Sequence, residues 1–197
     1  MRIFLSALIL IFSLQSWTKA DDVSDFEIEG MSIGDSLLNF FNKNEIEKNF
    51  PLPNKKFASH AGFGNNFETY QGFQAFYYVD DDNYIIHYLA GKNLYEGNNI
   101  DECYSKMYDI VESIKVILPN SPMQDNGVVK HTADKSGKST AHQIFFSFKD
   151  GSELVVTCTD WDEGMQKEGT HADNLAVNVR SSEFAEWLNS GEAYKPN

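Results

Sequence analysis

The stretch from Ala141 to Trp161 constrains the fold more than any other, because its strand pairing can be argued residue by residue. Two apolar runs flank Lys149-Asp150-Gly151, and a three-residue hairpin loop holds a residue such as Gly151 in the left-handed region. This loop sets Phe146 opposite Leu154. A slip by one residue in either strand would set apolar side chains against polar ones. The predicted apolar face of the hairpin comprises Ile144, Phe146, Phe148, Leu154, Val156 and Cys158.

The clearest helix is predicted from Asn99 to Leu118. Asn99 can cap the first turn, and Glu102 stands three residues later, as a capping box requires. Pro119 ends the helix, because proline cannot continue the hydrogen-bond ladder. Apolar residues recur at helical spacing and form one face, which comprises Cys103, Met107, Ile110, Ile114 and Ile117.

The first twenty residues have the order of a secretory signal peptide. A positive start at Met1-Arg2 precedes an apolar run from Ile3 to Leu14, and Thr18-Lys19-Ala20 ends on a small residue. The run is too short for a membrane span, which needs about 20 apolar residues. We therefore expect cleavage after Ala20 and a single domain over residues 21–197. Lysine outnumbers arginine by 14 to 2, which is typical of AT-rich bacterial genomes and favours a periplasmic or secreted location.

Cys103 and Cys158 are the two cysteines of the chain. An even number of cysteines in an exported protein indicates a disulfide. Cys103 lies on the apolar face of the predicted helix and Cys158 on that of the hairpin, so packing of helix on sheet brings them together. Neither belongs to a C-x-x-C motif, so a redox-active pair is not indicated. Two free buried thiols are the alternative interpretation.

The remaining strands also come in hairpins, which favours an antiparallel sheet over a doubly wound parallel one. The expected fold class is α+β: an antiparallel sheet of about five strands built from hairpins, packed against one long central helix, with an N-terminal helix and a short C-terminal helix. A helix is predicted from Ser32 to Phe50, either continuous or broken into two pieces at Asn42-Lys43-Asn44, and a loop follows over 54–66. The predicted strands are Thr69–Val79 and Tyr84–Leu89, joined by a turn at 80–83, a short strand at Val128-Val129 within a loop over 120–139, and a strand over 175–180. The last predicted helix is capped by Ser182 and runs to Leu188.

The run Gly34-Asp35-Ser36-Leu37 resembles the first signature block of the GDSL (SGNH) esterases. The resemblance implies an esterase with Ser36 as nucleophile and His171 as base. The later blocks of that family are incomplete here, because residues 97–100 lack the aspartate of G-x-N-D and Glu168 stands in place of the aspartate of D-x-x-H. Ser36 is therefore interpreted as a capping residue at the start of a helix, and no catalytic residue is assigned.

The chain is strongly acidic, with 16 Lys and Arg against 29 Asp and Glu. Loss of the signal peptide leaves 14 basic and 29 acidic residues, a net charge of −15. Such a surface argues against nucleic acid and anionic lipid, which require positive charge, and it suits a basic exported partner. The five histidines follow no metal-binding spacing, so neither a metal nor another cofactor is expected.

Three segments resemble a family of small exported bacterial proteins: FEIEGMSIGDSLL at 26–38, NIDECY at 99–104 and VTCTDW at 156–161. The first corresponds to the mature N-terminus of that family, and the other two carry its paired cysteines. The resemblance implies export and a cysteine pair, and no activity. We therefore expect an exported, monomeric, non-catalytic binding or accessory protein. The alternatives are the esterase that uses Ser36 and an inhibitor or partner of another exported protein.

Overall fold

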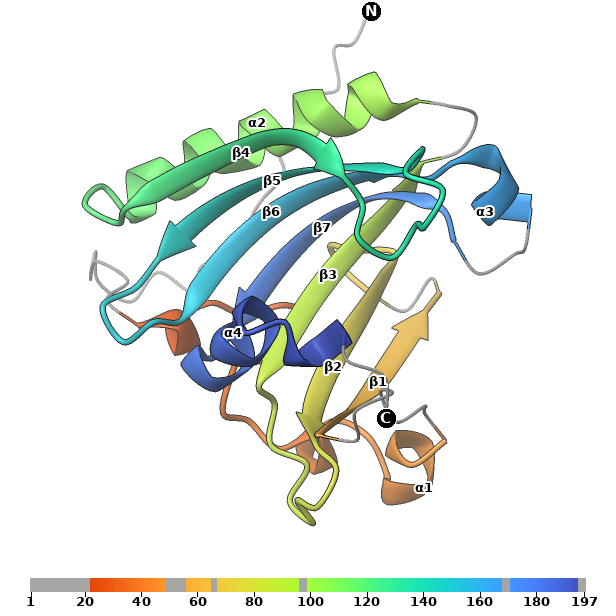
Figure 1. Ribbon diagram of the computed structural model, residues 1–197. Coiled ribbons are helices and arrows are strands. Elements are labelled where there is room, and N and C mark those ends of the chain that lie inside the picture. Colours follow the sequence, from red (N-terminus) through yellow and green to blue (C-terminus); the bar gives the residue numbers. More distant parts are fainter. Residues whose placement is uncertain (1–21, 49–55, 65–66, 96–98, 168–170, 195–197) are drawn as a thin grey trace, which may run out of the picture.

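The computed structural model describes residues 22–48, 56–64, 67–95, 99–167 and 171–194, which form an antiparallel sheet crossed by one long helix (Figure 1). The predicted signal peptide at 1–20 lies outside the described residues. The strands stand in the order β1-β2-β3-β7-β6-β5-β4. Their bounds are Phe57–Phe63 for β1, Gly72–Tyr78 for β2, Tyr88–Tyr95 for β3, Met123–Lys130 for β4, Thr140–Ser147 for β5, Glu153–Asp160 for β6 and Asp173–Arg180 for β7.

The α+β class is confirmed, but the described sheet has seven strands instead of about five. The loop predicted over 54–66 is wrong for β1, which pairs with β2 along its whole length. Gly62 interrupts the strand pattern of β1, yet a glycine is needed there, since an added Cβ would come within 2.8 Å of the Phe73 ring. β4 is longer than the short strand predicted at Val128-Val129. Almost all of its residues are exposed, so it lacks the apolar alternation that marks a strand.

The β5–β6 hairpin has the predicted register. Phe146 pairs with Leu154 and Ile144 with Val156. Gly151 has a φ of 89°, as the loop requires.

The helices are η1 (Val23–Asp25), η2 (Leu37–Asn39), α1 (Lys43–Ile46), α2 (Ile100–Ile117), α3 (Glu163–Lys167), α4 (Ser182–Asn189) and η3 (Glu192–Tyr194), where η marks a 3-10 turn. α2 is the predicted central helix. The side chain of Asn99 does not cap it, because the Asn99 amide donates to the Glu102 carboxylate instead. α4 is capped by Ser181, one residue before the predicted Ser182, through a bond from the Phe184 N–H.

The helix predicted from Ser32 to Phe50 is wrong: the described part of this range forms only η2 and the single turn α1. Gly34 has a φ of 91°, and Ser36 is extended and forms a bridge with Ile85. These contacts hold residues 34–36 out of helical geometry. Asn42 then starts α1 as a separate element by accepting the Glu45 N–H.

The turn predicted at 80–83 is part of a longer connection. β2 and β3 begin to pair at Phe76 and Tyr88, and the predicted strand Tyr84–Leu89 starts four residues later, as β3. Tyr84 has a φ of 52°, and the Asp81 carboxylate accepts the N–H groups of Asn83 and Ile85. This network, with the bridge from Ile85 to Ser36, ties the connection to the N-terminal segment as well as to β2, whose Phe76 carbonyl accepts the His87 N–H at 2.8 Å.

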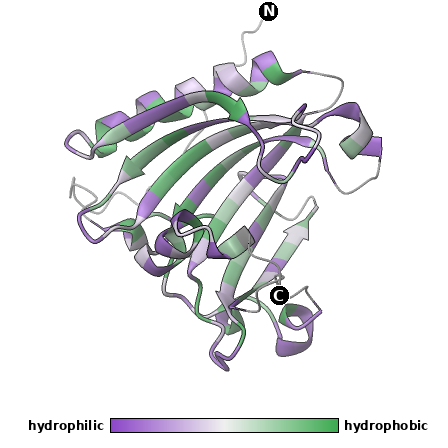
Figure 2. Ribbon diagram, in the orientation of Figure 1, coloured by the Kyte–Doolittle hydropathy of each residue, from purple (hydrophilic) through white to green (hydrophobic). Residues whose placement is uncertain are grey.

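Two apolar clusters occupy opposite faces of the sheet. The larger lies between the sheet, α2 and the N-terminal segment, and α2 buries Cys103, Met107, Val111 and Ile114 in it. The smaller lies under α4 and comprises Phe57, Phe76, Tyr88, Ala90, Phe184 and Trp187. Figure 2 shows the hydrophobic residues gathered along the central strands and hydrophilic residues along the outer side of α2.

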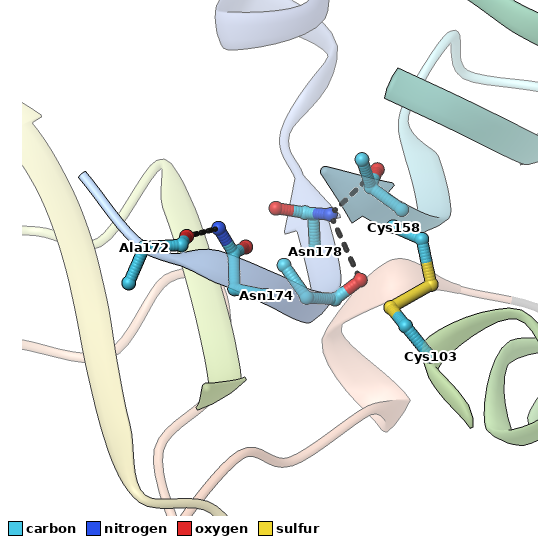
Figure 3. Close-up of a disulfide and its surroundings, with 7 residues drawn as sticks. Cys103, Cys158, Ala172, Asn174 and Asn178 are labelled. Carbon is cyan, nitrogen blue, oxygen red and sulfur yellow. Dashed lines mark hydrogen bonds between the residues drawn. A yellow bond between two sulfur atoms is a disulfide. The ribbon is translucent and has the colours of Figure 1, made fainter. Parts of the chain in front are cut away.

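The predicted disulfide is present. Cys103 of α2 and Cys158 of β6 are bonded, with their Cα atoms 6.0 Å apart and a sequence separation of 55 residues (Figure 3). Both residues are fully buried. On the other face of the sheet, the Asn178 amide donates to the Val155 carbonyl at 2.9 Å. The disulfide therefore fixes the first half of α2 to the middle of the sheet.

Candidate ligand-binding site

An apolar cavity of about 80 Å³ lies between α2 and the face of the sheet that α2 covers. This is about half the volume of an engineered apolar cavity that binds benzene, so the space suits a branched chain of roughly three or four carbons. Its lining comes from α2, from the neighbouring strands β6 and β7, and from the N-terminal segment. The main apolar groups are Ile110, Ile114, Ile117, Leu154, Val177 and Phe26.

The way in which α2 meets the sheet creates this cavity. The stripe of α2 that touches the sheet runs through Met107, Val111 and Ile114, all of them buried. Ile110 and Ile117, which the sequence predicts in the buried face, stand beside that stripe and are only partly buried. They form a wall of the cavity. The apolar face of α2 is therefore wider than the surface that the sheet covers.

A tight turn in the N-terminal segment closes one side of the cavity. Ile28 and Met31 exchange both backbone hydrogen bonds, at 2.9 and 3.0 Å. The two residues between them, Glu29 and Gly30, have φ values of 52° and 76°, as a type I′ turn requires. The turn buries Ile28 at the cavity wall.

The Glu29 carboxylate anchors this turn to the loop before β2. It accepts the backbone N–H groups of Glu68, Thr69 and Tyr70 at 2.8 to 2.9 Å. The Tyr70 side chain also lines the cavity, and burial raises the pKa of its hydroxyl to about 12. Its ring lies so close to Gly91 of β3 that an added Cβ there would come within 2.4 Å of it. Glu29 and Gly91 thus hold this wall in position.

An open, polar groove of about 500 Å³ adjoins the cavity at the first half of α2. Asn93 of β3 and Lys106 of α2 line both spaces, while Glu102, Ser105 and Asp109 line only the groove. The apolar cavity therefore opens into the polar groove at Asn93 and Lys106. Such a combination is typical of small-molecule sites, in which apolar walls supply affinity and a few polar groups fix orientation.

Ser36 has the capping role that the sequence predicts, although at a 3-10 turn instead of a long helix. Its Oγ accepts the Leu38 N–H and donates to the Asn83 carbonyl at 2.5 Å. The hydroxyl proton that a general base would have to remove is thus directed at a main-chain oxygen. His171, the base that the esterase interpretation requires, has its ring against Trp161, with the centroids 4.2 Å apart.

We expect Ser36→Ala to lower the free energy of unfolding by about 1 kcal/mol, because one capped N–H and one long-range bond are lost. Ester hydrolysis should not change. The measurement is chemical denaturation together with turnover of short-chain nitrophenyl esters, with His171→Ala assayed alongside. Clear turnover by the parent protein that both substitutions remove would contradict this assignment and establish the esterase.

Two other histidine arrangements have a structural explanation. His142 Nε2 lies 2.7 Å from Asp125 Oδ1, beneath the rings of Tyr104 and Tyr108. Asp125 stands where the register of β4 shifts, so the pair ties this irregular edge strand to β5.

In the second arrangement, the Trp161 ring contacts the tilted rings of His131 and His171, with ring centroids 4.2 Å apart in each pair. Burial, aided by the nearby His171, lowers the pKa of His131, so His131 favours its neutral form in this stack.

On the sheet face opposite α2, the partly buried Lys92 lacks, among the residues that the structure describes, the acidic partner that Arg180 finds in Glu153 at 3.1 Å. Lys92 Nζ donates to Gln74 Oε1 at 2.7 Å, and burial lowers the pKa of this lysine. No ion pair within the described residues compensates for the burial of the Lys92 ammonium group. Its burial therefore lowers the stability of the fold, and favourable packing around it has to compensate.

Within the described ranges, no cluster of three or more His, Cys, Asp or Glu side chains is arranged to hold a metal ion, and no helix has the length and apolarity to cross a membrane. Comparison of the chain with family models, curated proteins and solved structures finds no match in any of the three. The cavity beneath α2 was not foreseen from the sequence. The one signal for it is the width of the apolar face of α2, where Ile110 and Ile117 lie beside the stripe that the sheet covers.

Proposed function

We propose that the protein is an exported, non-catalytic binding protein whose ligand places an apolar group in the cavity beneath α2. The observation that carries this proposal is the cavity itself, which has walls from the N-terminal segment, the loop before β2, α2 and the sheet, and joins a polar groove. The disulfide between Cys103 and Cys158 supports export, because such bonds persist in oxidising compartments.

A matched pair of substitutions tests the proposal. Val177 of β7 and Val156 of β6 are directly paired and face α2, but only Val177 lines the cavity. Val177→Leu extends into empty space and should raise stability by about 0.5 kcal/mol or more. Val156→Leu extends into packed core and should lower it by about 1–3 kcal/mol.

The binding measurement uses 3-methylbutan-1-ol, a neutral branched probe of suitable size, followed by methyl NMR shifts of the mature protein. We expect saturable shifts of the Ile114 and Val177 methyl groups in the parent and in Val156→Leu, and at least a tenfold weaker response in Val177→Leu. Equal responses in both variants, or shifts confined to other methyl groups, would contradict the proposed function.

A further inference from the structure

We infer that the ligand of this site is a free α-amino acid with a branched apolar side chain, of the leucine or valine type. The inference rests on the proposed function and deepens it. It is drawn from the order of groups along the site: apolar walls inside, a cation and an amide at the junction, and carboxylates outside.

The junction offers hydrogen-bond donors to a negative group. Lys106 lines both the cavity and the groove, and within the described residues its ammonium group makes no ion pair or hydrogen bond. Asn93 lines both spaces as well, and its Oδ1 already accepts the Gln71 N–H at 3.0 Å, which leaves its Nδ2 as a donor. A carboxylate directly outside the apolar cavity would meet both donors.

The groove offers carboxylates to a positive group. Asp109 lies three residues after Lys106 on α2, and its carboxylate makes no ion pair or hydrogen bond within the described residues. Glu102, four residues before Lys106, also lines the groove and accepts the Asn99 amide. An ammonium group beside the ligand carboxylate can therefore contact Asp109 while the carboxylate contacts Lys106.

The charges that line the site favour an amino acid over amphiphiles that carry a charge of one sign only. A purely anionic amphiphile such as a short fatty acid would face Asp109 and Glu102 on a chain whose net charge is −13 before any processing. A purely cationic amphiphile would be repelled by Lys106, which lines both the cavity and the groove. A zwitterion satisfies both signs, and its side chain fits a cavity of about 80 Å³ that is too small for a large aromatic ring system.

The test compares four ligands that share one branched hydrocarbon end: leucine, 4-methylpentanoate, 3-methylbutylamine and neutral 3-methylbutan-1-ol. Dissociation constants are measured by NMR titration of the mature protein. We expect leucine to bind at least tenfold more tightly than either singly charged analogue, since each charge-assisted contact contributes about a factor of ten or more. Alanine, which leaves the cavity empty, should bind at least tenfold more weakly than leucine.

Three variants assign the contacts. Lys106→Gln should weaken leucine and 4-methylpentanoate about tenfold and leave the amine unaffected, whereas Asp109→Asn should weaken leucine and the amine and leave the acid unaffected. Lys115→Gln is the control, since Lys115 lies on the same helix and pairs with Glu112 at 2.6 Å. It should change no affinity.

The outcomes distinguish this inference from the proposed function. If the neutral alcohol binds in the cavity but leucine binds no more tightly than 4-methylpentanoate or 3-methylbutylamine, the amino-acid assignment is wrong and the binding function stands. If none of the four compounds shifts the cavity methyl groups, the proposed function itself fails.

Discussion

Simultaneous replacement of Cys103 and Cys158 by alanine is expected to lower the free energy of unfolding by about 2–5 kcal/mol. The bond closes a loop of 55 residues that contains most of α2 and the strands β4 and β5, so its loss frees a large part of the unfolded chain. Loss of the disulfide also removes the covalent cross-link between the side chains of α2 and β6. Denaturant unfolding of the mature protein measures this change.

Reduction of the parent protein provides the matched control, because it breaks the bond without removing the sulfur atoms. Reduced parent and double alanine variant should unfold at similar denaturant concentrations, both well below that of the oxidised parent. If the reduced parent is as stable as the oxidised one, the disulfide does not hold α2 on the sheet as described here.

Glu29→Ala should lower the free energy of unfolding by about 2 kcal/mol. The Glu29 carboxylate accepts three backbone N–H groups of residues 68–70, and hydrogen bonds to a charged group contribute more than neutral ones. Glu186→Ala is the control, because Glu186 is an exposed carboxylate on α4, away from the cavity, and its side chain makes no hydrogen bond or ion pair among the described residues. Its replacement should change stability by less than about 0.5 kcal/mol.

The same variant tests the wall of the cavity. With its anchor removed, the turn from Ile28 to Met31 should loosen, and 3-methylbutan-1-ol should bind several-fold more weakly to Glu29→Ala than to Glu186→Ala. Equal stability and equal binding in the two variants would show that the Glu29 contacts do not position this wall.

The sequence predicted those parts of the fold that depend on interactions between residues close together in the chain. The β5–β6 register follows from Gly151 and from strict alternation on both sides of it, and the disulfide follows from two apolar faces that must meet. The prediction of an N-terminal helix was wrong because contacts distant in sequence decide the conformation of that segment. The apolar spacing of Leu37, Leu38 and Phe41 imitates a helix, while bonds from Gly34 and Leu37 to residues 84–86 hold the segment in another shape.

The candidate site was beyond prediction because it has no local pattern. Its walls come from residues near 26, 70, 93, 110 and 177, and it exists only because α2 contacts the sheet along one stripe and leaves Ile110 and Ile117 beside it. Gly91 contributes by its small size, which admits the Tyr70 ring. Spacing within one segment carries no information on such an arrangement.

The most direct test of the account is a crystal structure of the mature protein under xenon pressure, because xenon occupies dry apolar cavities. We expect a xenon atom beneath α2, between Ile114 and Val177, in the parent and in Val156→Leu, and none at that position in Val177→Leu. A parent structure in which the space is closed by side chains or filled with ordered water, with no xenon beneath α2, would contradict it.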